Sequence, residues 1–530
     1  MTLIVKQFAI GYILGVLALM AALFALDHFF GVEIPSSISF IPFIIGVQIA
    51  AQKYAAREGS LPEKREAWRA SLMMTLATFA LSMAIEVAGG AHFRYEMGGW
   101  TAPYGIELSV GAFSALVLLI ITGAGALSLL AARPSIDRQI EQERQPLFYS
   151  AWLLALAGLV GITVSADAFN IFVFMEISSL ASYVLIAGGP DRRALPSVFK
   201  YRIMCTIGAT FYLIGIGLIY MMTGTLNLAD MEFRIHEVGE QRPILAAAGF
   251  ITVGLALKAA IFPLHVWLPN AYTYAPHMVT AFLAACSTKV ALYVLLRFDF
   301  FVFQENLAGH AFQFAVYLMP LAILGILVGS AVAMFEKNIK RLLAFSSVAQ
   351  IGYMMLGASL VTVAGLTAGI VHIFNHALAK GALFLAVASF ATVAAGLRLD
   401  DLKGIARRMP WTFGAFVVAG LSLIGIPGTA GFVSKWYLIS AAMEFGAAGL
   451  PLVAIILVSS LMAVVYVWRI VEAACFAKAA DESTSRASVP PLLVATLWLA
   501  AAANIYFGLV PDLPLTLAGD AAAELLDHLP

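Results

Sequence analysis

Residues 244–263 read ILAAAGFITVGLALKAAIFP, an apolar run of membrane length that carries Lys258 and is interrupted by Pro263. A transmembrane helix needs about 20 consecutive apolar residues. A charge near the centre of such a helix costs about 2.5–3.5 kcal/mol on insertion scales, so it is rare without a partner or a task. Proline removes a backbone donor, and unwound backbone at membrane depth is tolerated only where it is buried or lines a wet cavity. The stretch therefore predicts a broken membrane helix that holds a buried charge.

Apolar runs of this kind recur along all 530 residues, of which 62% are hydrophobic and 12% are charged. They predict an all-α polytopic membrane protein with about 15 transmembrane helices. The predicted spans are 4–26, 38–51, 70–89, 108–131, 147–165, 168–187, 203–223, 245–268, 278–296, 314–335, 342–360, 365–396, 411–443, 450–475 and 490–510. We expect an N-terminal three-helix region at 1–90, a main domain at 91–510 and a short C-terminal tail at 511–530.

Lysine and arginine concentrate in alternate loops between these spans, as short cytoplasmic loops require. The basic clusters lie at residues 53–69, 133–144, 192–202, 337–341, 398–408 and 478–486. The opposite loops hold only single arginines, namely Arg94, Arg234, Arg242 and Arg297. We therefore expect a multi-pass protein of the bacterial inner membrane with a cytoplasmic N-terminus and a C-terminus outside.

The composition also excludes several classes of function. Cys205, Cys286 and Cys475 show no CxxC or Cys/His spacing, which argues against iron–sulfur, zinc and disulfide frameworks. The net charge is zero and the basic residues are confined to short loops, so nothing indicates binding to nucleic acid. We expect no cofactor, no metal and no independent catalysis.

Three further lysines, Lys289, Lys380 and Lys435, lie inside predicted spans. Lys435 follows a second interruption at Pro427, and Lys258 similarly precedes Pro263. Paired interrupted helices of this kind are typical of transporters built from inverted repeats. Several lysines at membrane depth in one chain indicate a charge pathway.

Glu176 lies in the middle of the predicted span 168–187 and needs a partner there. One interpretation is a static ion pair with Lys258. The other is a carboxylate that modulates the proton affinity of that lysine, because burial favours the neutral amine whereas a neighbouring carboxylate favours the ammonium. We favour the second interpretation, in which movement of Glu176 switches Lys258 between holding and releasing a proton.

His372, His376 and Lys380 are spaced four residues apart and so lie on one face of a helix. A stripe of titratable groups can hold a chain of hydrogen-bonded water, and histidine titrates near neutral pH. The alternative is a polar seam that neighbouring helices satisfy. The spacing of the two histidines would allow a zinc site, but neither an HExxH motif nor a cysteine accompanies them. We therefore do not expect zinc here.

Lys289 lies nearer the middle of its span than a lysine that snorkels to the membrane surface would. Lys435 ends the row of buried lysines and could exchange protons with the outside. Asp167 and Asn170 flank a short interhelical turn and could simply cap the helix at 168–187.

The chain resembles the proton-translocating antiporter family shared by Mrp-type multisubunit cation/proton antiporters and the membrane arm of respiratory complex I. The matching stretches are 167–176, 257–269, 287–290, 338–347, 375–380 and 425–436. Together the resemblance covers about residues 95–510, and the stretches 95–100 and 459–474 resemble most the D-subunit branch of the Mrp family. Residues 1–90 look unlike the family, and Gln350 stands near a position where relatives can carry histidine.

This resemblance implies two inverted five-helix repeats, each with a broken helix, and a lateral proton path. By position, Glu176 and Lys258 look like the coupling pair and Lys289 like the central connecting lysine. His372, His376 and Lys380 look like the water wire, and Lys435 like the distal exit, where some relatives place glutamate.

The leading hypothesis is a proton-translocating subunit of a multisubunit monovalent cation/proton antiporter that exchanges Na⁺ for H⁺. Its partners would be other antiporter subunits, protons, Na⁺ and the lipid bilayer. The same residues would serve a proton-pumping subunit of complex I or of a membrane-bound hydrogenase, a translocase driven by redox chemistry. Further alternatives are a membrane subunit that energises bicarbonate uptake and a structural scaffold. The identity of the neighbouring subunits separates these hypotheses.

Overall fold

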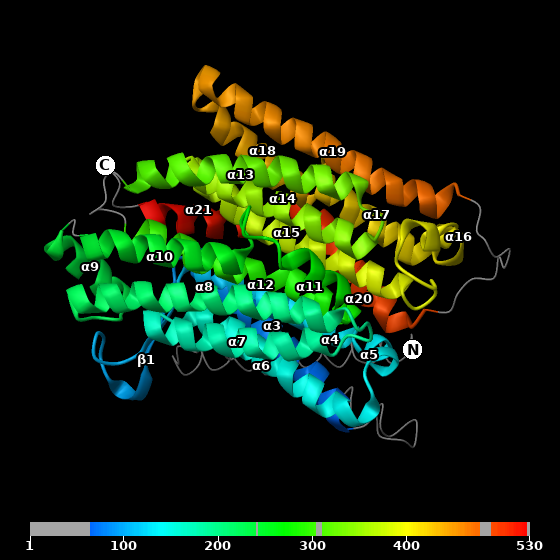
Figure 1. Ribbon diagram of the computed structural model, residues 1–530, viewed down its shortest axis with the longest axis horizontal. Helices are drawn as coiled ribbons and strands as arrows, with labels where there is room; N and C mark the ends of the chain where they lie inside the picture. The colour runs from blue at the N-terminus through cyan, green and yellow to red at the C-terminus, as the bar shows by residue number, and fades with distance from the viewer. Residues whose placement is uncertain (1–63, 240–241, 304–309, 478–488, 527–530) are drawn as a thin grey trace, which may run out of the picture. The chain divides into compact units, whose positions relative to one another are not determined.

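The computed structural model describes residues 64–239, 242–303, 310–477 and 489–526 (Figure 1). The chain divides into two units, 1–86 and 87–530. In the first unit the described residues belong to helix α3 (Lys64–Ala88), which extends two residues into the second. The predicted spans at 4–26 and 38–51 lie outside the described residues.

Eleven helices in the described part of the chain are long and apolar enough to cross a membrane. They are α4 (Ala112–Leu130), α6 (Gln145–Val164), α7 (Ala168–Ala187), α8 (Ala194–Thr223), α10 (Arg242–Ala259), α12 (His277–Arg297), α13 (His310–Phe335), α14 (Ile339–Ser359), α15 (Val363–Phe390), α19 (Leu450–Cys475) and α20 (Pro491–Leu509). The predicted polytopic helical fold is confirmed, although the number of 15 spans is not. In the described part of the chain one two-stranded sheet departs from an all-α fold, since β1 (Phe93–Glu96) and β2 (Glu107–Val110) pair antiparallel.

Both predicted interruptions are present. Helix α10 ends at Ala259, and the chain resumes as the short helix α11 (Leu268–Tyr274). The second span is divided into α17 (Pro410–Ile424) and α18 (Ala430–Met443). At the first break the carbonyl of Leu257 accepts from the amide of Ala260 at 3.3 Å and from the indole Nε1 of Trp267 at 2.9 Å, so the indole adds a second donor where the regular helical bonding ends.

Two matching backbone contacts reveal an internal repeat. Asp167 forms an antiparallel bridge with Asn227, and Asn338 forms one with Arg398, so that the partners are separated by the same length of chain in both cases. Helices α7 and α14 begin directly after the first partner of each bridge.

The elements therefore form two sets of five. The first set is α6, α7, α8, α10–α11 and α12, and the second is α13, α14, α15, α17–α18 and α19. In each set the fourth helix is the broken one. Because each set crosses the membrane an odd number of times, consecutive sets run in opposite directions, which makes the repeats inverted.

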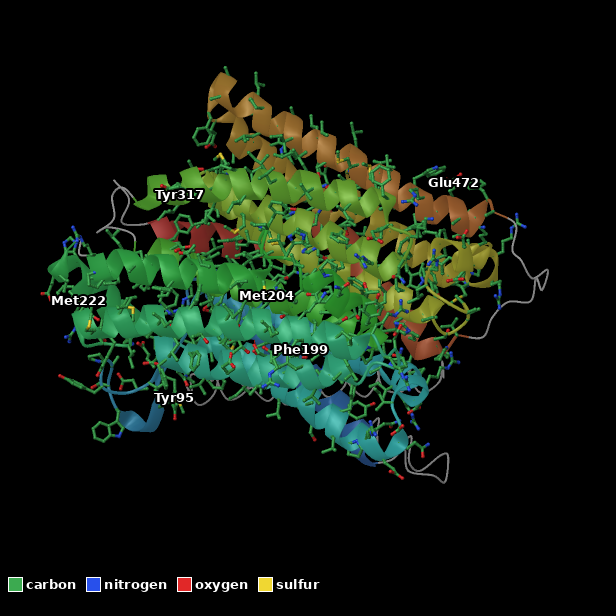
Figure 2. The ribbon with its side chains drawn as sticks, viewed as in Figure 1. Tyr95, Phe199, Met204, Met222, Tyr317 and Glu472 are labelled. Carbon is green, nitrogen blue, oxygen red and sulfur yellow. The ribbon has the colours of Figure 1, made fainter. Side chains whose placement is uncertain are left out.

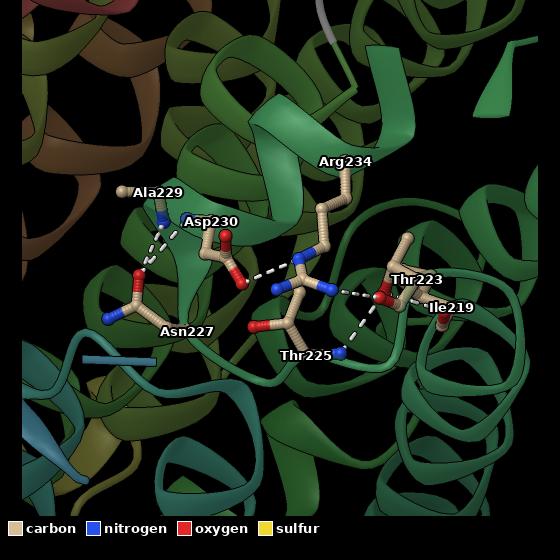
Figure 3. A network of polar contacts seen from close by, with 7 residues as sticks. All are labelled: Ile219, Thr223, Thr225, Asn227, Ala229, Asp230 and Arg234. Atoms are coloured by element: carbon tan, nitrogen blue, oxygen red, sulfur yellow. Dashed lines mark hydrogen bonds and ion pairs between the residues drawn. The ribbon is translucent and has the colours of Figure 1, made fainter. Parts of the chain in front are cut away.

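Side-chain caps fix the ends of these helices. In Figure 3 the side-chain oxygen Oδ1 of Asn227 accepts from the backbone amides of Ala229 and Asp230 and so caps the start of helix α9 (Leu228–Val238). Arg234 pairs with Asp230 at 2.8 Å and also donates to the carbonyl of Thr223 at the end of α8. This network closes the turn between α8 and α9. The predicted cap of α7 is also present, because the Asp167 carboxylate accepts from the amide of Asn170 at 2.7 Å.

The central helices are α12, α14 and α15, in which 89–94% of the most apolar 18-residue stretch is buried. By contrast, helix α19 is only 28% buried, and large side chains such as Phe199 of α8 and Tyr317 of α13 lie at the surface (Figure 2). The polar residues of α12, α14 and α15 are therefore shielded from lipid.

Where the sequence predicts a short tail after residue 510, the structure forms helix α21 (Asp512–Leu526), which packs on α15 and α4. Two further short helices are α5 (Arg133–Gln139) and α16 (Ile405–Arg408).

Asp167→Ala should lower the stability of the folded chain by about 1 kcal/mol, because it removes the cap of α7. Burial raises the pKa of the Asp167 carboxyl, which shows that a charge is disfavoured there. Asp167→Asn keeps the oxygen acceptor without the charge and should retain wild-type stability. Thermal unfolding of both variants in detergent measures the difference, and equal losses in the two variants would rule out the capping role.

Candidate functional site

The first pair of the predicted row is in contact. Lys258 Nζ lies 3.3 Å from Glu176 Oε1 and donates to Ser179 Oγ at 2.8 Å. The two side chains differ in environment, because that of Lys258 is 7% exposed whereas that of Glu176 is 27% exposed. The carboxylate therefore lies at the edge of the described fold, with the ammonium behind it.

A small cavity adjoins this pair. Its volume is about 30 Å³, and its polar lining includes Lys258, Ser178, Ser182 and Ser287. A cavity needs only about 10–15 Å³ of such volume to hold one water molecule, provided that polar partners line it. The cavity extends from Lys258 on α10 to Ser287 on α12, two residues before Lys289. It can therefore hydrate the space between the two helices that carry these lysines.

Lys289 is fully buried, so it does not snorkel to a membrane surface. Its ammonium donates to the carbonyl of Ala284 in the same helix. The helix that carries it, α12, packs on α15, which places Lys289 beside the second half of the row.

Helix α14 supplies a polar row opposite that of α15. Lys380 Nζ donates to the carbonyl of Leu343 at 2.6 Å and also to Ser346 Oγ. One turn further along α14, Gln350 contacts His372 on α15. Since the residue numbers rise along one helix and fall along the other, the two rows run antiparallel. His376 lies between these contacts on α15.

The partners of His372 suit either protonation state of its ring. Nε2 lies 2.9 Å from Gln350 Oε1, and Nδ1 lies 2.8 Å from Ser434 Oγ. A neutral ring donates from Nε2 to the glutamine oxygen and accepts at Nδ1 from the serine hydroxyl. In the protonated ring both nitrogens donate, and Ser434 then donates to the carbonyl of Gly431, which is 3.3 Å away. No large rearrangement is required between the two states.

His376 differs from His372 because neither of its ring nitrogens has a hydrogen-bond partner among the described residues. The Asn375 side-chain oxygen beside it also lacks one. Both residues are buried, and the rings of His372 and His376 lie nearly parallel with centroids 6.2 Å apart. Buried polar groups are almost always satisfied by protein or by ordered water. An ordered water molecule would satisfy these groups.

Lys435 is held by the second interruption. Its ammonium donates to the carbonyls of Leu423 and Ile424 at 3.2 and 2.7 Å and to Ser460 Oγ at 3.0 Å. These carbonyls belong to the last turn of α17, which has no further turn to bond them. The ammonium also lies 5.1 Å from the centre of the Tyr353 ring on α14. The end of the row is therefore joined to α14 as well.

Several partners in this site were not identified from the sequence. They are Ser179, Ser346, Tyr353, Ser434 and Ser460. Serine in an apolar helix usually bonds its own backbone, so its presence alone carries no signal for a particular contact. Spacing could have indicated Ser346, Gln350 and Tyr353, which follow one another at intervals of four and three on α14.

A fifth buried lysine was also missed, because the basic residues at 337–341 read as one exposed loop cluster. Lys340 is only 1% exposed, and its ammonium donates to the carbonyl of Ala275 at 2.7 Å. Ala275 caps the C-terminal end of α11, so Lys340 ties α14 to the broken helix of the first repeat. Another buried group outside the predicted row is Asp299, which accepts from Thr252 at 3.0 Å.

The family described as NADH:quinone oxidoreductase/Mrp antiporter, TM, matches residues 165–463. The chain is 41% identical over 434 residues to NADH-quinone oxidoreductase subunit N of Desulforudis audaxviator, covering 82% of this chain and 85% of that protein. It is 30% identical over 402 residues to the D subunit of the Na⁺/H⁺ antiporter of Alkalihalophilus pseudofirmus, covering 76% and 79%. A chain in the structure of the Mrp complex from Dietzia sp. DQ12-45-1b superposes with a TM-score of 0.78 at 26% identity, covering 92% of this chain and 96% of that one.

Gly425→Ala should displace Lys435. Gly425 has a φ of +92°, which strains any L side chain, and an added Cβ would lie 2.8 Å from Lys435 Cδ. We expect a loss of about 1–2 kcal/mol in stability from the left-handed conformation alone. Gly217→Ala is the matched control, because Gly217 lies in a helix with open space around its Cα and should tolerate alanine. Thermal unfolding compares the two, and an unchanged Gly425→Ala protein would contradict this geometry.

Proposed function

The chain belongs to the NADH:quinone oxidoreductase/Mrp antiporter family, and on that premise we propose that it is the proton-translocating subunit of a multisubunit antiporter that exchanges Na⁺ for H⁺. The observation that carries the proposal is the row of buried titratable groups that crosses both repeats. It begins at Glu176 and Lys258, passes Lys289 and the polar residues of α15, and ends at Lys435.

The Glu176–Lys258 pair is the switch of this path. While the carboxylate is near, it favours the ammonium form of Lys258. If Glu176 moves away through its exposed edge, the ammonium loses its countercharge and can release a proton to Ser179 or to water in the adjoining cavity. The cavity then conveys the proton toward α12 and Lys289.

Proton transfer continues along the facing rows of α14 and α15. The hydrogen-bond partners of Lys289 and Lys380 in the described structure are neutral oxygens, so each lysine can lose its proton without leaving an unpaired carboxylate behind. Water around His376 connects Lys380 to His372. His372 can take up a proton at Nδ1 and release it there with only a reorientation of the Ser434 hydroxyl. Transfer from Nε2 to Nδ1 also requires the Gln350 amide to rotate, so that its NH₂ group faces the deprotonated Nε2. Lys435 then receives the proton at the second break.

The Na⁺ step and the driving force belong to the assembled complex. The membrane potential supplies about 2.3 kcal/mol per charge per 100 mV.

The chain is a multi-pass membrane protein, and we further propose that its N-terminus is cytoplasmic, because basic residues cluster in alternate loops.

A second candidate function is a proton-pumping subunit of a redox-driven membrane complex. The 41% identity to NADH-quinone oxidoreductase subunit N favours it. The same path would then be driven by electron transfer in other subunits. Mass spectrometry of the subunits that co-purify with the chain distinguishes the two: further cation-antiporter subunits support antiport, whereas iron–sulfur or nickel subunits support the redox pump.

Lys258→Ala and Glu176→Ala should each abolish Na⁺-dependent proton exchange in inverted membrane vesicles while the complex still assembles. Each change removes one half of the proposed switch. The matched control is the double variant Glu141→Ala/Arg144→Ala, which removes an exposed ion pair of 2.9 Å and should leave exchange unchanged. Full exchange in both single variants would refute the path.

Gln350→Leu should slow exchange at least tenfold, because it leaves the Nε2 of His372 buried without an acceptor, a loss of about 1–3 kcal/mol. Gln350→His keeps a polar partner at this position and should retain much of the rate. Both variants are compared for exchange rate and assembly. If Gln350→Leu exchanged as fast as the wild type, His372 would lie outside the proton path.

A further inference from the structure

A basic pocket of about 600 Å³ opens on the surface between the two repeats. Four cationic side chains line it, namely Arg193, Lys337, Arg341 and Arg398, together with the carboxylate of Glu336. The lining therefore has a net charge of +3. Arg193 precedes α8 of the first repeat, whereas the other four residues lie around the start of α14 and the Asn338–Arg398 bridge of the second. A ligand in this pocket would contact both repeats.

Within the described ranges, two of these four cations pair with a carboxylate and two do not. Arg341 pairs with Glu336 at 2.9 Å, and Arg193 pairs with Asp191 at 2.6 Å. Among the described residues, Lys337 and Arg398 form no ion pair. Asp400, whose charge both of them influence, is already paired with Lys403 at 2.8 Å. The pocket thus presents two exposed, uncompensated cations to a ligand.

The backbone fixes these two cations at neighbouring positions of one antiparallel bridge, since Arg398 pairs with Asn338 and Lys337 directly precedes Asn338. Leu399 donates to the carbonyl of Lys337 and Ile339 donates to that of Leu397, both at 2.9 Å. Asn338, between them, caps the 21-residue helix α14, whose N-terminal end carries partial positive charge. An anion can therefore bind here with little ordering of the backbone, and the arginine fork suits a phosphate in particular.

One wall of the pocket is apolar and belongs to a membrane helix. Val332 and Phe335 lie in the last turn of α13, and the Phe335 side chain is 78% exposed. The spans of α13 and α14 end and begin beside the pocket, at Phe335 and Ile339. The ends of apolar helices of membrane length are where lipid headgroups are expected to meet the hydrocarbon core. A soluble anion would leave the aromatic wall exposed, whereas an acyl chain would pack against it.

We propose that this pocket binds the phosphodiester headgroup of an anionic phospholipid, with an acyl chain along Val332 and Phe335. Basic pockets between transmembrane helices are typical sites for such headgroups. The bound lipid joins α8 and α11 of the first repeat to α13 and α14 of the second. This inference is independent of which ion the complex exchanges.

The test measures lipid binding to the purified complex that contains the full chain, exchanged into phosphatidylcholine nanodiscs and titrated with labelled phosphatidylglycerol. The double variant Lys337→Gln/Arg398→Gln should bind phosphatidylglycerol at least tenfold more weakly. Both side chains are exposed and form no ion pair with any residue that the structure describes, so the fold should be retained. Arg144→Gln, which removes a basic residue outside the pocket, should bind like the wild type. Wild-type affinity in the double variant would overturn the proposal.

Two further arms identify the occupant. Phe335→Ser should weaken binding of phosphatidylglycerol, and inorganic phosphate at millimolar concentration should not displace the lipid. Displacement by phosphate together with no effect of Phe335→Ser would show a soluble anion instead. A photoreactive benzophenone side chain placed at position 335 should crosslink to lipid in native membranes. A crosslink to another polypeptide in place of lipid would show an acidic segment of a partner protein and would overturn the lipid assignment.

Discussion

An ammonium group buried among membrane helices must find its oxygen acceptors within the protein, because hydrocarbon supplies none. The structure meets this requirement with backbone carbonyls that interrupted or adjoining helices leave accessible. Lys435 takes the carbonyls of Leu423 and Ile424 at the end of α17, and Lys340 takes that of Ala275 at the end of α11. The breaks and the lysines therefore depend on each other. A continuous α17 would remove the acceptors of Lys435, and an apolar residue in its place would leave the carbonyls unsatisfied.

The acceptors also divide the row into two kinds of site. Lys258 bonds to a carboxylate, whereas Lys289, Lys380 and Lys435 bond to carbonyl and hydroxyl oxygens. Loss of a proton at the first kind leaves Glu176 as an uncompensated charge, while loss at the second kind leaves no charge at all. An unpaired charge in a low-dielectric interior is costly. Loss of a proton therefore costs more free energy at Lys258, as long as Glu176 stays beside it, than at a lysine that bonds to neutral oxygens. A position near the exposed edge gives Glu176 room to move, which the fully enclosed lysines lack.

Both inverted repeats place a lysine near a broken helix, but the lysine has different partners in the two repeats. In the first, the indole of Trp267 donates to a carbonyl at the break, and the nearby lysine is free to pair with Glu176. In the second, the lysine itself satisfies the break. The basic pocket lies where helices of both repeats end, so charge at the surface and charge in the core are arranged around the same junction of α11 and α14.

Hydropathy, loop charges and spacing were sufficient to predict the helical membrane fold, both interruptions, the cap at Asp167 and the helix face shared by His372, His376 and Lys380. These features repeat with the period of a helix or the thickness of a bilayer, so they can be read along the chain. The burial of Lys340, the contact of Gln350 with His372 and the capture of the α17 carbonyls by Lys435 could not be read in this way. Each joins residues from different helices, and the packing of those helices, rather than any local period, determines which side chains meet.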